Sequence, residues 1–243
     1  MERTKLRKRL LVAAAIGAAA IAGAATATAT AAHSHPAPHV AENVRTTFAP
    51  APATPKLAPH DYVHPLASVI GQVDLGDEVL VAPGASIRGD EGTPIHIGDG
   101  SNVQDGVVIH ALETFDDGHA IEANTVLVGG ARYAVYVAER VSIAHQAQIH
   151  GPASVGENTF VGMQALVFRA EVGANCVLEP RALVMGVKVP QGRYVPAGAV
   201  IRTQAAADAL PKIDESYSFA HLNEGVLHVN QQLAESYARH YTP

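Results

Sequence analysis

The sequence has few of the residues that build a conventional globular core. Its 243 residues include one cysteine, Cys176, and no tryptophan, and aromatic residues make up 5% of the chain. A single cysteine excludes an intrachain disulfide framework, and the scarcity of aromatics excludes a core of large rings. Charged residues are also few, at 16%, against about 25% in an average soluble domain. Small aliphatic side chains must therefore fill the interior, and Cys176 is expected to be one of the small buried residues.

Basic residues are scarce outside the first ten positions, which hold five of the 17 lysines and arginines. The formal net charge is −6. Nucleic-acid binding depends on clustered basic side chains that contact phosphates. The charge distribution therefore predicts no nucleic-acid partner.

The N-terminal segment has the three-part order of an export signal. Residues 1–10 are basic, an alanine-rich apolar run follows, and residues 27–31 offer A-x-A cleavage sites. This order predicts a signal peptide over residues 1–32, a periplasmic or extracellular location, and no membrane attachment after cleavage. An uncleaved anchor is the alternative. Residues 33–60 are rich in Pro, Ala and His, which predicts a linker or an extension lying along the surface.

From residue 70 onward, aliphatic residues recur every six positions. The longest series is Val137, Ile143, Ile149, Val155, Val161 and Val167. A period of six fits neither an amphipathic helix nor an alternating strand, but it is the period of a hexapeptide β-helix. Three hexads then close one triangular coil, with the aliphatic side chains inside. We predict a β-helix domain over residues 61–203.

The six-residue period breaks twice, and the longer break spans residues 115–136. Within it, residues 125–128 and 131–136 flank Gly129-Gly130, which predicts a hairpin. The acidic segment 113–117 before the hairpin is expected to be an exposed loop. Such insertions often carry function.

After Val200 the hydrophobic residues change to helical spacing. The spacing predicts a helix from about Ser216 to Arg239 that packs along one side of the prism. It belongs to a C-terminal segment, residues 204–243, that would cap the solenoid. The predicted fold class is thus all-β with a C-terminal helix.

Three histidines have the spacing of a metal site. His110 and His150 each follow an aliphatic hexad residue and, without the insertion, are one full coil apart. Neighbouring strands stack about 4.8 Å apart, so two outward imidazoles can share one ion. His145 lies around a corner, so a neighbouring subunit packed about a three-fold axis would have to present it. Three His ligands with one open position are typical of catalytic zinc.

Several segments resemble the γ-class carbonic anhydrases. They are residues 86–92 (SIRGDEG), 101–106 (SNVQDG), 110–114 (HALET), 144–146 (AHQ), 150–152 (HGP), 178–181 (LEPR), 223–224 (NE) and 229–230 (VN). The resemblance covers about residues 60–240. It implies a homotrimer of left-handed parallel β-helices. It also implies reversible hydration of carbon dioxide to bicarbonate and a proton, by attack of a metal-bound hydroxide, with Zn²⁺, or Fe²⁺, as the metal and Co²⁺ as a substitute.

The resemblance also implies roles for individual residues. The metal would be held by His110 and His150 of one subunit and His145 of the next. Residues that serve the reaction would be the proton shuttle Glu113, Glu91 for proton movement near the metal, Gln104 and its supporting Asn102 at the hydroxide, Asn230 for placing carbon dioxide, and Arg88 for holding bicarbonate. Residues that pair across the interface would be Arg88, Asp90 and Asp105.

The loop after Glu113 departs in length and composition from the better-known family members, which leaves the efficiency of the shuttle open. His119 in this loop is a second candidate for relaying protons. Two other functions stay open. One is a catalytically silent scaffold or bicarbonate-binding module, and the other is a hexapeptide acyltransferase, which often uses one interfacial His as a base.

Overall fold

The computed structural model describes residues 39–241. The predicted signal peptide, residues 1–32, and the start of the predicted linker lie outside the described residues. Within residues 39–241, no helix is both long and apolar enough to span a bilayer.

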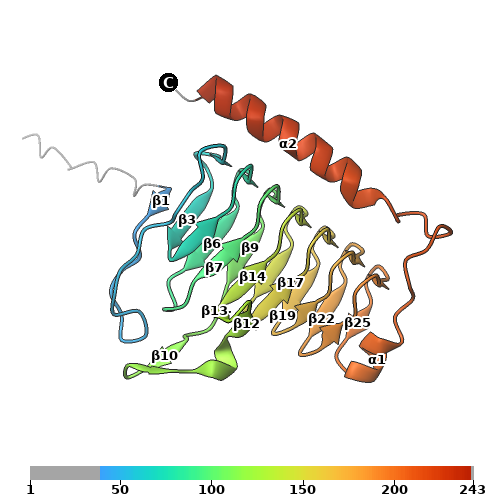
Figure 1. Cartoon of the computed structure of the whole chain (residues 1–243), viewed down its shortest axis with the longest axis horizontal. Coiled ribbons are helices and arrows are strands. Elements are labelled where there is room, and N and C mark those ends of the chain that lie inside the picture. Colours follow the sequence, from blue (N-terminus) through green and yellow to red (C-terminus); the bar gives the residue numbers. More distant parts are fainter. Residues whose placement is uncertain (1–38, 242–243) are drawn as a thin grey trace, which may run out of the picture. The chain divides into compact units, whose positions relative to one another are not determined.

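The chain winds into a parallel β-solenoid whose short strands form three sheets (Figure 1). The eight-stranded face contains β1 (Val40–Ala41), β3 (Ser68–Gly71), β6 (Ser86–Gly89), β9 (Val108–His110), β16 (Gln148–His150), β19 (Leu166–Phe168), β22 (Leu183–Met185) and β25 (Val200–Ile201). The six-stranded face contains β4 (Val73–Leu75), β7 (Ile95–Ile97), β14 (Val135–Val137), β17 (Ala153–Val155), β20 (Glu171–Val172) and β23 (Lys188–Val189). The seven-stranded face contains β2 (Tyr62–Val63), β5 (Leu80–Val81), β8 (Asn102–Val103), β15 (Ser142–Ile143), β18 (Phe160–Val161), β21 (Val177–Leu178) and β24 (Tyr194–Val195).

The hexad residues fill the interior of this solenoid. They are fully buried on all three faces, as in Ile109, Val137 and Ile143. Cys176 is also buried, among the same aliphatic side chains. The prism is too narrow for aromatic rings, which explains their scarcity. The predicted hexapeptide β-helix is confirmed.

The N-terminal part of the described chain lies along the first coil. Strand β1 pairs in parallel with β3 and extends the eight-stranded face by one strand. The Lys56 ammonium lies 3.1 Å from the Asp74 carboxylate on the six-stranded face. Residues 39–60 therefore hug the surface of the solenoid.

The insertion contains two hairpins where the sequence predicts one. The first joins β10 (Phe115–Asp116) to β11 (His119–Ala120), inside the segment expected to be a loop. A 3₁₀ helix, η1 (Glu122–Asn124), leads to the second, β12 (Val126–Val128) with β13 (Ala131–Tyr133). The solenoid resumes at β14, earlier than expected, because Tyr136 pairs with His96 of the six-stranded face.

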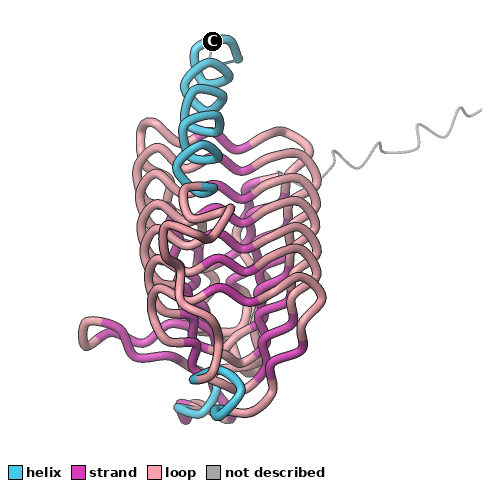
Figure 2. Tube along the Cα trace, turned by 90° about the vertical axis from the view of Figure 1, so that its right-hand side faces the viewer, coloured by secondary structure: helices cyan, strands magenta, loops and turns pink. Residues whose placement is uncertain are grey.

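Two helices end the chain, α1 (Gln204–Asp208) and α2 (Leu222–Tyr241). Helix α2 runs along the stacked coils, against β2, β5, β8 and β15 of the seven-stranded face (Figures 1 and 2). It begins six residues later than the predicted Ser216. The Asp214 carboxylate accepts hydrogen bonds from the Ser216 backbone N–H and hydroxyl, and the Tyr217 hydroxyl donates to Glu179. These contacts hold the segment before α2 in turns.

Candidate metal centre

His110 and His150 are register partners on adjacent coils. They end β9 and β16 of the eight-stranded face, and their ring centroids lie 5.7 Å apart with the ring planes at 80°. Both side chains are half-buried and point outward because Ile109 and Ile149 before them fill the interior. The pairing confirms the register expected from counting hexads.

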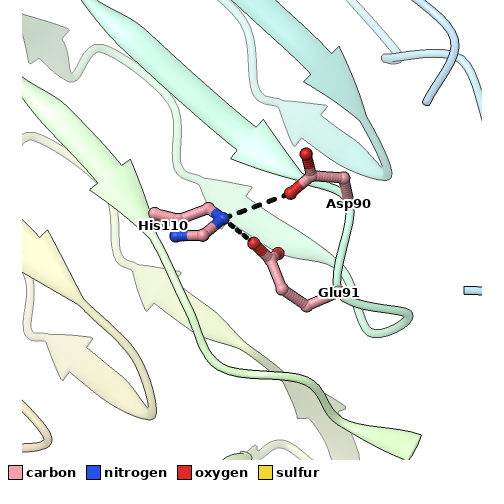
Figure 3. Close-up of side chains that lie close together, drawn as sticks. All are labelled: Asp90, Glu91 and His110. Carbon is pink, nitrogen blue, oxygen red and sulfur yellow. Dashed lines mark hydrogen bonds and ion pairs between the residues drawn. The ribbon is translucent and has the colours of Figure 1, made fainter. Parts of the chain in front are cut away.

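Three charged side chains converge on the Nε2 atom of His110. Asp90 Oδ1 lies 3.2 Å from this nitrogen, Glu91 Oε1 contacts it (Figure 3), and an Arg88 guanidinium nitrogen contacts it as well. Strand β6 ends at Gly89, so the chain turns there and delivers Asp90 and Glu91 to the histidine. Arg88 Nε also lies 3.6 Å from Asp90 Oδ2, which pairs these two residues within one chain.

Glu91 is a buried carboxylate whose charge is stabilised mainly by His110. It is 4% exposed, and neither of its oxygens makes a hydrogen bond, although Oε1 contacts His110 outside hydrogen-bond geometry. Burial raises the pKa of Glu91 to about 7 because desolvation disfavours the charged form. Burial is the largest single influence on the pKa of His110 and lowers it, but the Glu91 and Asp90 carboxylates together raise it by more, so the net shift is upward.

These groups have the chemistry of a cation site. Among residues 39–241, Asp90, Glu91 and His110 form a group whose ligand atoms all lie within 4.8 Å of one another. Imidazole nitrogens and carboxylate oxygens are ligands for Zn²⁺ and similar divalent ions. A buried carboxylate that contacts one of two outward imidazoles therefore fits a bound cation.

His145 lies on the other side of a solenoid corner. It follows β15, its side chain is 53% exposed, and it is not part of the group around His110. Its Nδ1 atom lies 3.1 Å from Asp105 Oδ2, so Nε2 is the nitrogen left to bind an ion. His145 lines a groove of about 800 Å³ between helix α2 and the seven-stranded face, together with Gln104, Asp105 and Asn230.

Gln104 ends a buried chain of polar side chains. Its Nε2 donates to Asn102 Oδ1 at 2.9 Å, and Asn102 Nδ2 donates to Ser142 Oγ at 2.9 Å. Ser142 is not among the predicted site residues, although its position one coil beyond Asn102 follows from the register of β8 and β15. The chain of hydrogen bonds orients the Gln104 amide at the groove.

The remaining predicted site residues lie apart from one another. Asn230 donates to the backbone carbonyl of Val226 within α2. Glu113 is exposed three residues beyond His110, and its backbone carbonyl accepts a hydrogen bond from Asn124. His119 is exposed in the first hairpin of the insertion. One chain thus holds two separate clusters, one around His110 and His150 and one around His145.

Comparisons with known proteins agree with the solenoid fold. Residues 152–180 match the family model described as a hexapeptide repeat of succinyl-transferase. The chain is 55% identical over 200 residues to a carbonic anhydrase of Methanosarcina thermophila, with 82% of this chain and 81% of that protein covered. It is 45% identical over 201 residues to the carboxysome assembly protein CcmM of a Nostoc species, covering 80% of this chain and 34% of CcmM. The chain therefore spans about a third of the length of that CcmM.

Among solved structures, a hexapeptide transferase family protein from Anaplasma phagocytophilum aligns with a TM-score of 0.57. The alignment covers 76% of this chain and 93% of that chain at 22% identity. A likeness at this identity shows a shared solenoid fold and says nothing of acyl transfer.

Proposed function

The chain belongs to the γ-class carbonic anhydrases, and from this premise we propose that it hydrates carbon dioxide reversibly at sites shared between the subunits of a homotrimer. One observation carries the proposal. A single chain presents two incomplete clusters, His110 and His150 on the eight-stranded face and His145 at the groove beyond the corner. Each cluster supplies what the other lacks when the corner of one subunit packs on the eight-stranded face of the next.

His110 and His150 of one subunit and His145 of the next would hold a divalent cation, Zn²⁺ or Fe²⁺, with Co²⁺ as a substitute. The register pairing of the first two residues and the acidic groups beside them fit this role. When bound, the cation supplies the Lewis acidity that makes water a nucleophile near neutral pH.

The side chains of the groove would position the substrate. The Gln104 amide is held by Asn102, so it can present a fixed hydrogen-bonding group to the attacking water. Asn230 lines the same groove and would help to place carbon dioxide. On the other cluster, the Arg88 guanidinium beside His110 would bind the bicarbonate anion.

Two carboxylates would move the proton that the hydration releases. Glu91 is buried beside His110 and would accept the proton near the reacting water, while Glu113 is exposed and would pass it to solvent. Transfer through positioned groups is efficient when their pKa values lie near the working pH. Burial raises the pKa of Glu91 towards this range, whereas a cation held by His110 would lower it, so the two effects together would set how readily Glu91 takes up and releases the proton.

Stopped-flow measurement of carbon dioxide hydration tests the proposal. The purified protein is loaded anaerobically with Fe²⁺ or Zn²⁺, and His110→Ala serves as the control that should lose metal and activity together. Hydration that requires metal and scales with metal content supports the proposal and ranks the two metals. A fully loaded trimer without hydration would refute it.

The similarity to CcmM supports a second candidate function, that of an assembly scaffold. CcmM is named as a carboxysome assembly protein, and the chain spans about a third of its length. A silent scaffold would form the trimer and hold metal without turning over. The same stopped-flow experiment therefore separates the two functions.

We further propose that the chain is exported and works in the periplasm or outside the cell. The proposal depends on the basic, apolar and A-x-A order of residues 1–32. N-terminal sequencing of protein recovered from a periplasmic fraction tests it. A start near residues 30–33 is expected, and an intact N-terminus found only in the cytoplasm would contradict export.

A further inference from the structure

Three buried polar side chains beneath the Glu113 loop have no role in the function described so far. Thr93 lies between β6 and β7, Thr114 follows Glu113, and Asn124 ends η1. Each is buried, and Thr114 is 1% exposed. Buried polar groups cost free energy unless they are hydrogen-bonded. The hydrogen bonds of these three side chains therefore show what they hold in place.

Thr114 ties the chain beside Glu113 to the peptide of Glu91. Its hydroxyl donates to the Glu91 backbone carbonyl at 2.6 Å, and its backbone N–H donates to the same carbonyl at 2.9 Å. The hydroxyl also accepts a hydrogen bond from the Thr93 hydroxyl at 2.7 Å. Thr114 thus makes two hydrogen bonds to the backbone carbonyl of Glu91, the residue whose side chain contacts His110.

The other side of Glu113 is held from the insertion. Asn124 Nδ2 donates to the Glu113 carbonyl at 2.8 Å, and the Ile121 N–H donates to the Thr114 carbonyl at 2.7 Å. The backbone of Glu113 is therefore fixed on both sides, while its side chain stays exposed.

Close packing at Gly92 leaves the Glu91 turn little room to adjust. Gly92 has a φ of +98°, and a Cβ at this position would lie 2.3 Å from the Phe48 carbonyl oxygen and 2.8 Å from the Phe115 ring. The turn is thus enclosed by the N-terminal extension, the first hairpin and Thr114.

We propose that Thr114 is a positioning residue that fixes the carboxylates of Glu91 and Glu113 relative to each other and to His110. The proposal rests on the proposed function, in which these two carboxylates carry the proton away. Hydrogen bonds to one backbone carbonyl couple the two segments, so the spacing of the carboxylates depends on the Thr114 hydroxyl. The hydroxyl bonds to the Glu91 carbonyl and the Thr93 hydroxyl, so Thr114 would act through the carboxylates and not on the substrate.

The test compares Thr114→Val with a matched control, Thr125→Val, in the metal-loaded protein. Thr125 also donates to a glutamate backbone carbonyl, that of Glu122, and accepts one hydrogen bond, from Arg132, but it is only half-buried and makes no bond to Glu91. At low buffer concentration, kcat should fall at least fivefold in Thr114→Val and stay unchanged in Thr125→Val. Because the defect is in proton release, kcat/KM and metal content should stay within twofold of the native values.

Added imidazole distinguishes a role in proton transfer from a purely structural role, because only a defect in proton transfer should respond to it. A small buffer can accept the proton directly, so imidazole should restore kcat in Thr114→Val towards the native value. Thr114→Ser keeps the hydroxyl and should behave like the native protein. If Thr114→Val fails to form trimers, Asn124→Ala, which removes the other anchor of Glu113, should show the same imidazole-dependent loss.

The possible outcomes separate the two proposals. Absence of hydration by the native trimer overturns the proposed function and this inference with it. Active native protein with unchanged kcat in Thr114→Val, or with a loss that imidazole does not restore, overturns the inference alone.

Discussion

The Nδ1 atom of His145 lies 3.1 Å from a carboxylate oxygen of Asp105, one coil away on the same solenoid corner. The Gln146 N–H also donates to the Asp105 carbonyl at 2.9 Å, which holds the two coils in register at this corner. A carboxylate that accepts from one ring nitrogen fixes the orientation of the imidazole and directs the other nitrogen outward. The resemblance to the γ-class carbonic anhydrases implies that Asp105 pairs across the interface with Arg88 and Asp90. Within the chain, Asp105 faces His145, and Arg88 faces Asp90.

Replacing Asp105 with alanine should weaken metal binding without breaking the trimer. Loss of a carboxylate that orients a ligating histidine typically costs about 10–100-fold in metal affinity. Competition with a chelator measures the affinity, and sedimentation measures the trimer. Asp117→Ala, an exposed acid in the first hairpin turn, is the matched control. Native metal affinity in Asp105→Ala would mean that the pair does not serve a ligand.

Replacing His145 with alanine should abolish stoichiometric metal binding and weaken the trimer. The variant removes one of three ligands, and it does so at the proposed contact between subunits. Metal analysis and sedimentation of the same sample report both effects, with His221→Ala as the control because His221 is an exposed histidine paired with Glu224. Unchanged metal stoichiometry in His145→Ala would contradict a metal site shared between two subunits.

Mixed trimers provide a sharper test of sites shared between chains. Subunits carrying His110→Ala and subunits carrying His145→Ala should each be empty of metal alone. When the two are dissociated together and reassembled at equal amounts, about a quarter of the interfaces should combine the intact His145 of one chain with the intact His110 of the next. Metal content and hydration should recover to about that fraction. No recovery in trimers that do contain both variants would place all the ligands in one chain.

The fold could be predicted from the sequence because a hexapeptide repeat is set by local geometry. Each hexad makes one side and one corner, so counting hexads from Ile109 to Ile149 predicts that His110 and His150 are neighbours, and they are. The same count places Ser142 next to Asn102. Within the periodic part, register and burial follow from position alone.

The non-periodic segments could not be predicted in the same way. The first hairpin, the later start of α2 and the buried Thr114 depend on contacts between residues far apart in sequence, such as Tyr217 with Glu179 and Thr114 with Glu91. A lone threonine after a glutamate carries no periodic signal. The contact of Glu91 with His110 also depends on the turn after β6. This turn lies outside the hexapeptide period, so the repeat does not predict the contact.

Stability should depend on pH through Asp61. Burial raises the pKa of this carboxyl from 3.8 to about 6, although it accepts hydrogen bonds from the N–H groups of Ala58 and Val79. Between pH 3.8 and about pH 6, the Asp61 carboxyl binds a proton more tightly in the folded chain than in the unfolded chain. Protonation of Asp61 therefore stabilises the folded state. This stabilisation is complete below about pH 4 and is lost as the pH rises through 6.

Asp61→Asn removes this titration and isolates its effect. The native protein should lose roughly 1–3 kcal/mol of unfolding free energy relative to Asp61→Asn when the pH is raised from 4 to 7. Denaturant unfolding at each pH measures it. A difference between the two proteins that is constant with pH, or that moves the other way, would show that Asp61 is charged and satisfied in the folded state throughout this range.

Replacing Ser142 with alanine should disturb the Gln104 amide at the groove, although Ser142 itself lies outside the groove. Ser142 is fully buried, and its hydroxyl is the acceptor for Asn102 Nδ2. Its loss leaves a buried amide donor unpaired, which costs about 1–3 kcal/mol of stability. It also frees Asn102 to rotate, and with it the Gln104 amide that donates to Asn102. We expect a lower melting temperature together with a several-fold fall in kcat/KM, whereas Ser154→Ala, a half-buried serine on the six-stranded face, should change neither. A fall in melting temperature with native kcat/KM would show that the Gln104 amide keeps its orientation without Asn102, and that the buried chain serves the fold alone.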